Sequence, residues 1–277
     1  PTGNTLLITC EPPDVKSYDS CFLSQFSTVI TSNRTLDHSN LVFGQQGLPW
    51  MIGAELNVQS LTWKNYKSFE DLERPVSDKN KILSVIASIK SATKGHVARS
   101  RFIEMLAHEL GDVLDVYGLG RIPVVDKWQA IAPYRYHLAI ENCTIPDYWT
   151  EKLSDAFIGE AFPIYSGCTN IGDYFPSDAF EIINIDQPED ALNKIRHIIS
   201  SDLWCKRHEA ISEAKRRVLY EHNLFCLLST FLKNNYRAPE RKVLLTLRPE
   251  EDIANRHTLA GVLWKKLSRL KNVMRTR

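Results

Sequence analysis

The chain has 277 residues, a length that accommodates two modest domains or one large one. Apolar residues make up 43% of it and charged residues 24%, which excludes a disordered or low-complexity chain. The 34 Lys and Arg residues nearly balance the 33 Asp and Glu residues, so attraction to nucleic acid or to a membrane would have to be local.

Residues 1–78 are expected to form an N-terminal α/β domain. Two apolar runs, Leu6 to Cys10 and Ser27 to Thr31, predict strands. The charged segment from Lys67 to Lys81 contains a proline and has little apolar periodicity. It is therefore the predicted linker to the next domain.

Residues 79–205 alternate strand patterns with helix patterns. Helices are predicted around Phe102 to Leu110, closed by Gly111, and over Tyr148 to Ile158. Strands are predicted at Ile82 to Ile89, Asp112 to Tyr117, Tyr136 to Ile140, Ala161 to Tyr165 and Ile182 to Ile185. Because parallel strands of one sheet need crossover connections, the alternation predicts a Rossmann-like domain with a parallel, doubly wound sheet.

Residues 206–277 are expected to be a helical segment with a basic tail. An apolar face predicts one long helix from about Lys206 to Lys233. From Leu259 to Arg277, apolar residues share one helical face, and six bases occur with no acid. Such a helix is typical of one that lies on an anionic membrane surface, and packing on the protein body is the alternative. No nucleic-acid motif accompanies the charges, so a nucleic-acid partner is not expected.

Polar groups are most concentrated after the predicted strand Tyr136 to Ile140. Glu141 and Asn142 end that strand, and the next helix carries Glu151 and Lys152 in its first turn. Ligands bind at the carboxyl ends of parallel strands, and helix N-termini attract phosphate. The pattern predicts a phosphate or diphosphate site, with a solvated helix cap as the alternative.

These residues resemble the signature of the α1,3/4-fucosyltransferases, glycosyltransferase family 10. The resemblance rests on Glu141-Asn142, Tyr148-Trp149-Thr150-Glu151-Lys152, Pro163-Ile164-Tyr165-Ser166-Gly167 and Tyr174-Phe175-Pro176. The segment from Gly95 to Phe102 is similar to the family's loop-to-helix segment, in which Arg99 matches the arginine that faces the nucleotide diphosphate. The segment from Thr9 to Pro13 is similar to the strand end whose glutamate, here Glu11, is the proposed catalytic base.

The resemblance implies a GT-B fold, in which two Rossmann-like domains face each other across a cleft. The first domain would hold the acceptor and the second would hold GDP-fucose. Only ten residues precede Glu11, so the first domain is either truncated in this chain or unusually small.

The resemblance also implies an inverting transfer of L-fucose from GDP-fucose to the 3-hydroxyl, or the 4-hydroxyl, of N-acetylglucosamine in a glycan. Glu11 would accept the proton of the acceptor hydroxyl. Arg99 and Lys152 would stabilise the charge of the GDP leaving group, so no metal or other cofactor is required. The remaining donor-binding residues are expected to be Glu151, Tyr148, Asn142, Ser88 and Lys90.

Two alternatives stay open: a GT-B transferase that uses another nucleotide sugar, and a catalytically inactive glycan-binding relative. The six cysteines contain no Cys-x-x-Cys pair, which favours free thiols in a reducing compartment. The expected location is the cytoplasm, with the tail on the inner membrane face of a bacterium. In a eukaryote, it would be the Golgi lumen, with an upstream anchor missing from this sequence.

Overall fold

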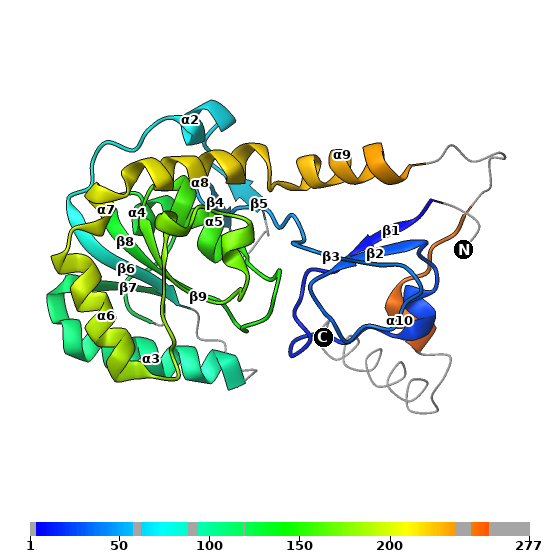
Figure 1. The fold of residues 1–277 in the computed structure, drawn as a ribbon, viewed down its shortest axis with the longest axis horizontal. Helices are drawn as coiled ribbons and strands as arrows, with labels where there is room; N and C mark the ends of the chain where they lie inside the picture. The colour runs from blue at the N-terminus through cyan, green and yellow to red at the C-terminus, as the bar shows by residue number, and fades with distance from the viewer. Residues whose placement is uncertain (1–3, 58–61, 88–93, 119, 237–244, 255–277) are drawn as a thin grey trace, which may run out of the picture. The chain divides into compact units, whose positions relative to one another are not determined.

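The computed structural model describes residues 4–57, 62–87, 94–118, 120–236 and 245–254 (Figure 1). The chain divides into two compact units. Unit 1 combines residues 1–44 with residues 232–277, and unit 2 is formed by residues 45–231.

Unit 2 is built on a five-stranded sheet with the strand order β10-β9-β8-β6-β7. Every pair of neighbours in it is parallel. Its strands are β6 (Lys81–Ala87), β7 (Leu114–Gly118), β8 (Tyr134–Ile140), β9 (Phe162–Ser166) and β10 (Glu181–Ile182). The prediction of a parallel, doubly wound sheet is confirmed: β8 ends at Ile140 as predicted, and the other strand bounds are shifted by one to three residues.

The helices of unit 2 precede, connect or follow these strands, and they cover the sheet (Figure 1). They are α2 (Phe69–Glu73), α3 (Lys94–Leu110), α4 (Lys127–Ile131), α5 (Glu151–Ile158), α6 (Pro188–Ser200), α7 (Leu203–Lys206) and α8 (His208–Tyr220). Helix α9 (Leu224–Asn235) continues from unit 2 across the boundary at Phe231. Short 3-10 helices occur at Gly111–Val113, Ile171–Asp173 and Ser177–Ala179, and an antiparallel pair is formed by β4 (Glu55–Asn57) and β5 (Thr62–Lys64).

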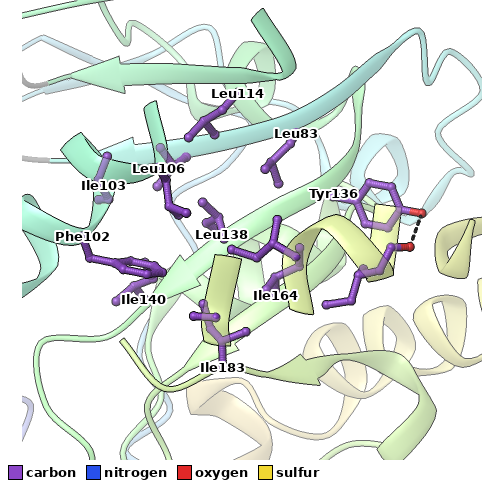
Figure 2. Close-up of a cluster of buried hydrophobic side chains, with 14 of the residues drawn as sticks. Leu83, Phe102, Ile103, Leu106, Leu114, Tyr136, Leu138, Ile140, Ile164 and Ile183 are labelled. Carbon is purple, nitrogen blue, oxygen red and sulfur yellow. Dashed lines mark hydrogen bonds between the residues drawn. The ribbon is translucent and has the colours of Figure 1, made fainter. Parts of the chain in front are cut away.

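Two apolar clusters pack against the sheet. One joins Leu138 and Ile164 of the sheet to Leu106 of α3 and Ile195 of α6, and Figure 2 shows most of its labelled side chains converging. The other contains Phe157 of α5 and residues of α8. Helices therefore cover the sheet on both faces, which is why its strands are nearly continuous apolar runs.

Unit 1 contains a parallel three-stranded sheet with the order β1-β2-β3. Its elements are β1 (Leu6–Ile8), α1 (Ser20–Leu23), β2 (Thr28–Thr31), β3 (Leu41–Phe43) and α10 (Glu250–Ala254). The two predicted N-terminal strands are present. The early and late parts of the chain meet in this unit, because Glu250 accepts a hydrogen bond from the Asp19 N–H at 3.1 Å and pairs with Lys16 at 2.9 Å. Each unit thus has a parallel α/β sheet, as a GT-B chain requires.

The predicted domain boundaries at 78/79 and 205/206 differ from these units. The expected linker, Lys67 to Lys81, packs on unit 2, where Leu72 is buried in the α5 core and α2 begins with a capping box between Ser68 and Asp71. A segment with a single buried leucine shows no hydrophobic periodicity, so its sequence did not predict that it packs against a core. Residues after 205 also belong to unit 2, since α8 buries its apolar face there.

The predicted helix from Lys206 to Lys233 is in fact two helices, α8 and α9, and α7 ends at Lys206, where the single helix was expected to begin. The break before α9 has a local cause. Asn223 caps the new helix, and its side-chain oxygen accepts the Cys226 N–H at 3.0 Å. An apolar face continues across such a break, so periodicity alone predicted one helix.

No disulfide joins the six cysteines, all of which lie within the described ranges. Across those ranges, no helix has both the length and the apolar character needed to cross a membrane. The basic tail from Leu259 to Arg277 lies outside the described residues, so its binding to a membrane surface stays a prediction.

Candidate functional site

The candidate site lies at the carboxyl ends of β6 and β8. From β6 the chain passes to β7 on one side and then returns to β8 on the other side of β6. Open α/β sheets bind ligands outside the strand ends where the strand order reverses in this way. Arg99 reaches this point from α3, which follows β6, while Glu141 and Asn142 follow β8 directly.

Arg99 binds the carboxyl end of β8. Its Nη1 donates to the Asn142 side-chain oxygen at 2.8 Å and to the Ile140 carbonyl at 3.4 Å. Only 4% of the residue is exposed. Burial lowers the pKa of the guanidinium, and the carboxylates of Glu141 and Glu151 oppose that shift. An arginine pKa is so high that the side chain remains protonated.

Helix α5 presents its N-terminus at the same edge of the sheet. Thr150 is the N-cap, and its Oγ1 accepts the Lys152 N–H at 3.3 Å. The predicted start at Tyr148 is wrong by three residues, because Tyr148 and Trp149 precede the cap. The first turn therefore directs backbone N–H groups and the positive end of the helix dipole toward the site.

Glu141 is the buried centre of this arrangement. Its side chain is 0% exposed, and its carboxylate accepts hydrogen bonds from the Thr150 N–H and Oγ1, each at 2.8 Å. Burial raises the pKa of Glu141, against the opposing influence of Lys152. Gly167 leaves room for the side chain, because a Cβ there would lie 2.5 Å from the Glu141 Cγ.

Lys152 extends from the first turn of α5 into the same cluster. Its Nζ lies 3.4 Å from the Glu141 Oε2 and 3.2 Å from the Glu151 Oε1, and its side chain is 22% exposed. Burial alone would lower the pKa of Lys152, but Glu141 and Glu151 outweigh burial and hold it above the ordinary value. Arg99 opposes this rise, so the two predicted phosphate-binding cations are close enough to repel each other.

Lys127 and Asp155 complete the cluster, and sequence reasoning missed both. The Lys127 Nζ pairs with Asp155 at 2.7 Å and lies 3.9 Å from the Glu151 Oε1. Asp155 is also the acceptor for the backbone N–H groups of Met51 and Ile52. One signal was available, since Asp155 follows Glu151 by four residues and so lies on the same face of α5.

A hydrogen-bonded loop supports the α5 N-terminus. Asp147 has a left-handed backbone with φ 63°, and its Oδ1 accepts from the Asn170 amide at 2.9 Å and the Tyr174 hydroxyl at 2.7 Å. These bonds fix the chain just before the cap. Tyr148, which follows Asp147, is only 2% exposed, so its predicted contact with a ligand stays a prediction.

The structure thus brings four predicted residues together: Arg99, Asn142, Glu151 and Lys152. Ser88 and Lys90 lie outside the described residues. Glu11 is exposed and belongs to unit 1, so its part in the site stays a prediction.

Chemically, the cluster joins three cations, Arg99, Lys127 and Lys152, to three carboxylates, Glu141, Glu151 and Asp155. Beside it lies a helix N-terminus, so the arrangement suits a diphosphate. In the described part of the chain, no group of three or more His, Cys, Asp or Glu side chains is arranged to hold a metal ion.

Comparison with known proteins gives a family match. Residues 76–236 match the model "Glycosyltransferase family 10 (fucosyltransferase) C-term". The chain is 31% identical over 123 residues to mouse alpha-(1,3)-fucosyltransferase 4, which covers 43% of this chain and 28% of the relative. It is 30% identical over 120 residues to the human 3-galactosyl-N-acetylglucosaminide 4-alpha-L-fucosyltransferase FUT3, covering 41% of this chain and 33% of the relative.

Both matches span a third or less of the relative's length. Among solved structures, the chain is similar to an alpha1,3-fucosyltransferase with GDP-fucose, at 16% identity and a TM-score of 0.48. That match covers 81% of this chain and 77% of the other.

Proposed function

Because the chain belongs to glycosyltransferase family 10, whose model matches residues 76–236, we propose that it transfers L-fucose from GDP-fucose to a glycan. The acceptor group is the 3-hydroxyl of N-acetylglucosamine. The name of the mouse relative specifies an alpha-1,3 linkage, and that of the human relative specifies an N-acetylglucosaminide acceptor and position 4. These names support the sugar and the acceptor class, and they make position 4 the alternative.

One observation carries the donor assignment: Arg99 binds the end of β8 and Lys152 lies in the first turn of α5, so both cations lie at the switch point of the sheet. As the bond to the sugar breaks, negative charge grows on the departing diphosphate. Fixed cations stabilise that state more than the ground state, and loss of one preorganised donor of this kind typically lowers the rate about 10² to 10³-fold. Arginine binds two phosphate oxygens in a fork, and lysine adds a point charge.

Glu11 is proposed as the general base that accepts the proton of the acceptor hydroxyl. The resemblance of the segment from Thr9 to Pro13 to the family's strand end suggests this role, and two observations agree with it: Glu11 follows β1 closely, and it is exposed. A positioned base contributes about 10² to 10⁴-fold in rate. The attacking oxygen displaces GDP from the opposite side of the sugar, so the β-linked donor gives an α-linked product.

The donor assignment is tested by calorimetric binding of GDP to the full chain. Arg99→Ala should weaken binding at least about tenfold, because hydrogen bonds to charged groups contribute about 1.5 to 3 kcal/mol. The matched control is Arg101→Ala on the same helix, an exposed residue whose loss should change the affinity less than about twofold. Thermal unfolding of both variants separates lost binding from lost folding.

Turnover is tested with a panel of GDP-fucose, GDP-mannose and UDP-galactose and an N-acetyllactosamine acceptor. Consumption of GDP-fucose alone supports the proposal. Consumption of another sugar nucleotide identifies a different transferase, and glycan binding without turnover identifies an inactive relative. Glu11→Gln should abolish transfer and leave GDP affinity unchanged, whereas Asp14→Asn, another exposed acid three residues later, should keep both.

A further inference from the structure

We propose that Glu141 is a positioning residue for the donor diphosphate: its buried carboxylate holds the Lys152 ammonium beside Arg99 at the ends of β6 and β8. This inference rests on the proposed function, because a diphosphate is the ligand assigned to these cations. Glu141 itself would not touch the donor. It would act through Lys152.

The backbone of Glu141 is fixed by the sheet. Its N–H donates to the Ser166 carbonyl at 2.8 Å, which extends the pairing of β8 with β9 by one residue. The carboxylate is then fixed by the Thr150 N–H and hydroxyl at the α5 cap. It has no exposed surface, so it cannot turn toward solvent. A carboxylate held at this many points is a rigid anchor for an ammonium.

The charges around Lys152 show why an anchor is needed. Glu151 faces it from its own helix, Arg99 from α3 and Glu141 from the end of β8. Lys127 of α4 also pairs with Glu151, with its Nζ 3.9 Å from the Glu151 Oε1. Two cations placed together for a diphosphate repel each other and resist burial, and Glu141 is the buried acid that acts on both.

Lys79 shows how a buried lysine of this unit behaves without such an anchor. Its Nζ donates to the Gly159 carbonyl, and burial lowers its pKa to about 7 despite the charge of Glu160. Lys152 is likewise largely buried, yet its pKa is raised, with Glu141 as the strongest favourable influence. Without the Glu141 charge, the Lys152 ammonium should lose its proton at a much lower pH.

The test is GDP affinity measured by calorimetry on the full chain from about pH 7 to about pH 9. The unaltered chain should show a nearly flat profile, because Lys152 stays protonated. Glu141→Gln should lose affinity as the pH rises through the lowered pKa of Lys152, by up to about tenfold for each pH unit above it. Adding Lys152→Arg to that variant should flatten the profile, because arginine keeps its charge.

The matched control is Glu160→Gln. Glu160 is also a buried acid of unit 2, pairs with Lys215 at 2.8 Å and accepts the Val76 N–H at 2.9 Å. Its loss should destabilise the unit without making GDP affinity depend on pH. Equal profiles for Glu141→Gln and Glu160→Gln would overturn the inference.

A second measurement covers the case in which Glu141→Gln does not fold. Methyl groups enriched in ¹³C are added to the lysines of the unaltered chain, and the Lys152 signal, assigned with Lys152→Arg, is titrated by NMR. A Lys152 pKa above the ordinary lysine value supports the inference, and one below it refutes the inference. If the unaltered chain binds no GDP at any pH, the proposed function fails, while this titration still tests whether Lys152 is held as a cation by the carboxylates around it.

Discussion

Replacing Gly167 with alanine tests how tightly the site is built. Gly167 directly follows β9, and a Cβ added there would lie 2.5 Å from both the Glu141 Cγ and the Tyr165 hydroxyl. Neither neighbour can retreat, because both side chains are buried. The Tyr165 hydroxyl also accepts the Cys168 N–H at 2.8 Å, so displacing it leaves a buried donor without its acceptor.

The expected cost follows from these two effects. Overpacking a buried region costs about 1 to 3 kcal/mol, and leaving a buried donor unsatisfied costs about 1 to 3 kcal/mol. The lower entropy of an unfolded chain with alanine returns about 0.4 to 1 kcal/mol. The net loss in the free energy of unfolding is therefore about 1 to 5.6 kcal/mol, with a midpoint of about 3 kcal/mol that corresponds to roughly 6 to 12 °C in Tm for a unit of this size.

Thermal and urea unfolding measure this cost, and calorimetry measures GDP affinity, which should fall because Glu141 is displaced. Gly172→Ala is the control, since nothing lies within 4 Å of a Cβ added there. That variant should stay within about 0.5 kcal/mol of the unaltered chain. If Gly167→Ala were as stable as Gly172→Ala and bound GDP equally well, the packing argument would be refuted.

Three further substitutions test other parts of unit 2 by urea unfolding: Lys79→Met, Phe157→Ala and Thr150→Ala, the last two each with a control variant. Because folding lowers the pKa of Lys79 to about 7, the unfolded chain binds more protons above that pH, and this lysine makes stability rise with pH. Lys79→Met should therefore remove about 2 kcal/mol of the gain between about pH 7 and about pH 9; an unchanged slope would contradict this. Phe157→Ala, at a site that is 0% exposed, should lower the free energy of unfolding by about 3 to 5 kcal/mol. Its control is Phe225→Ala, at a site that is 82% exposed, which should lower it by less than about 0.5 kcal/mol. Thr150→Ala should cost about 1 kcal/mol and weaken GDP binding, whereas Thr150→Ser should keep both; equal stability of the two would argue against the cap.

The sequence predicted what depends on local pattern. The alternation of strand and helix patterns predicted the parallel sheet. The polar residues after Ile140 and at the start of α5 predicted where the candidate site lies. The role of Arg99 was predicted from the family resemblance alone, because hydrophobic periodicity does not show which side chains face a binding site. Its contact with Asn142, 43 residues later, exists only because β6 and β8 pair in the sheet.

Other features could not be predicted because they arise from tertiary contacts. Lys127 belongs to a five-residue helix and reaches Asp155 across 28 positions of the chain. Glu141 was noted as a strand end and as part of the family signature, but nothing in its sequence neighbours shows that its carboxylate would be buried. The predicted domain bounds differ from the two compact units because unit 1 is discontinuous, and local composition does not reveal that two distant segments fold together.

The discontinuity of unit 1 orders events during synthesis on the ribosome. Asp19 and Gln25 emerge early, but their partners Glu250 and Arg248 are made 231 and 223 residues later. At about 5 to 20 residues per second, that delay is roughly 10 to 45 s. The contiguous unit 2 can fold during this time, whereas the contacts of the α1 region with α10 cannot form until α10 has been made. The segment around α1 therefore remains without these partners while unit 2 folds.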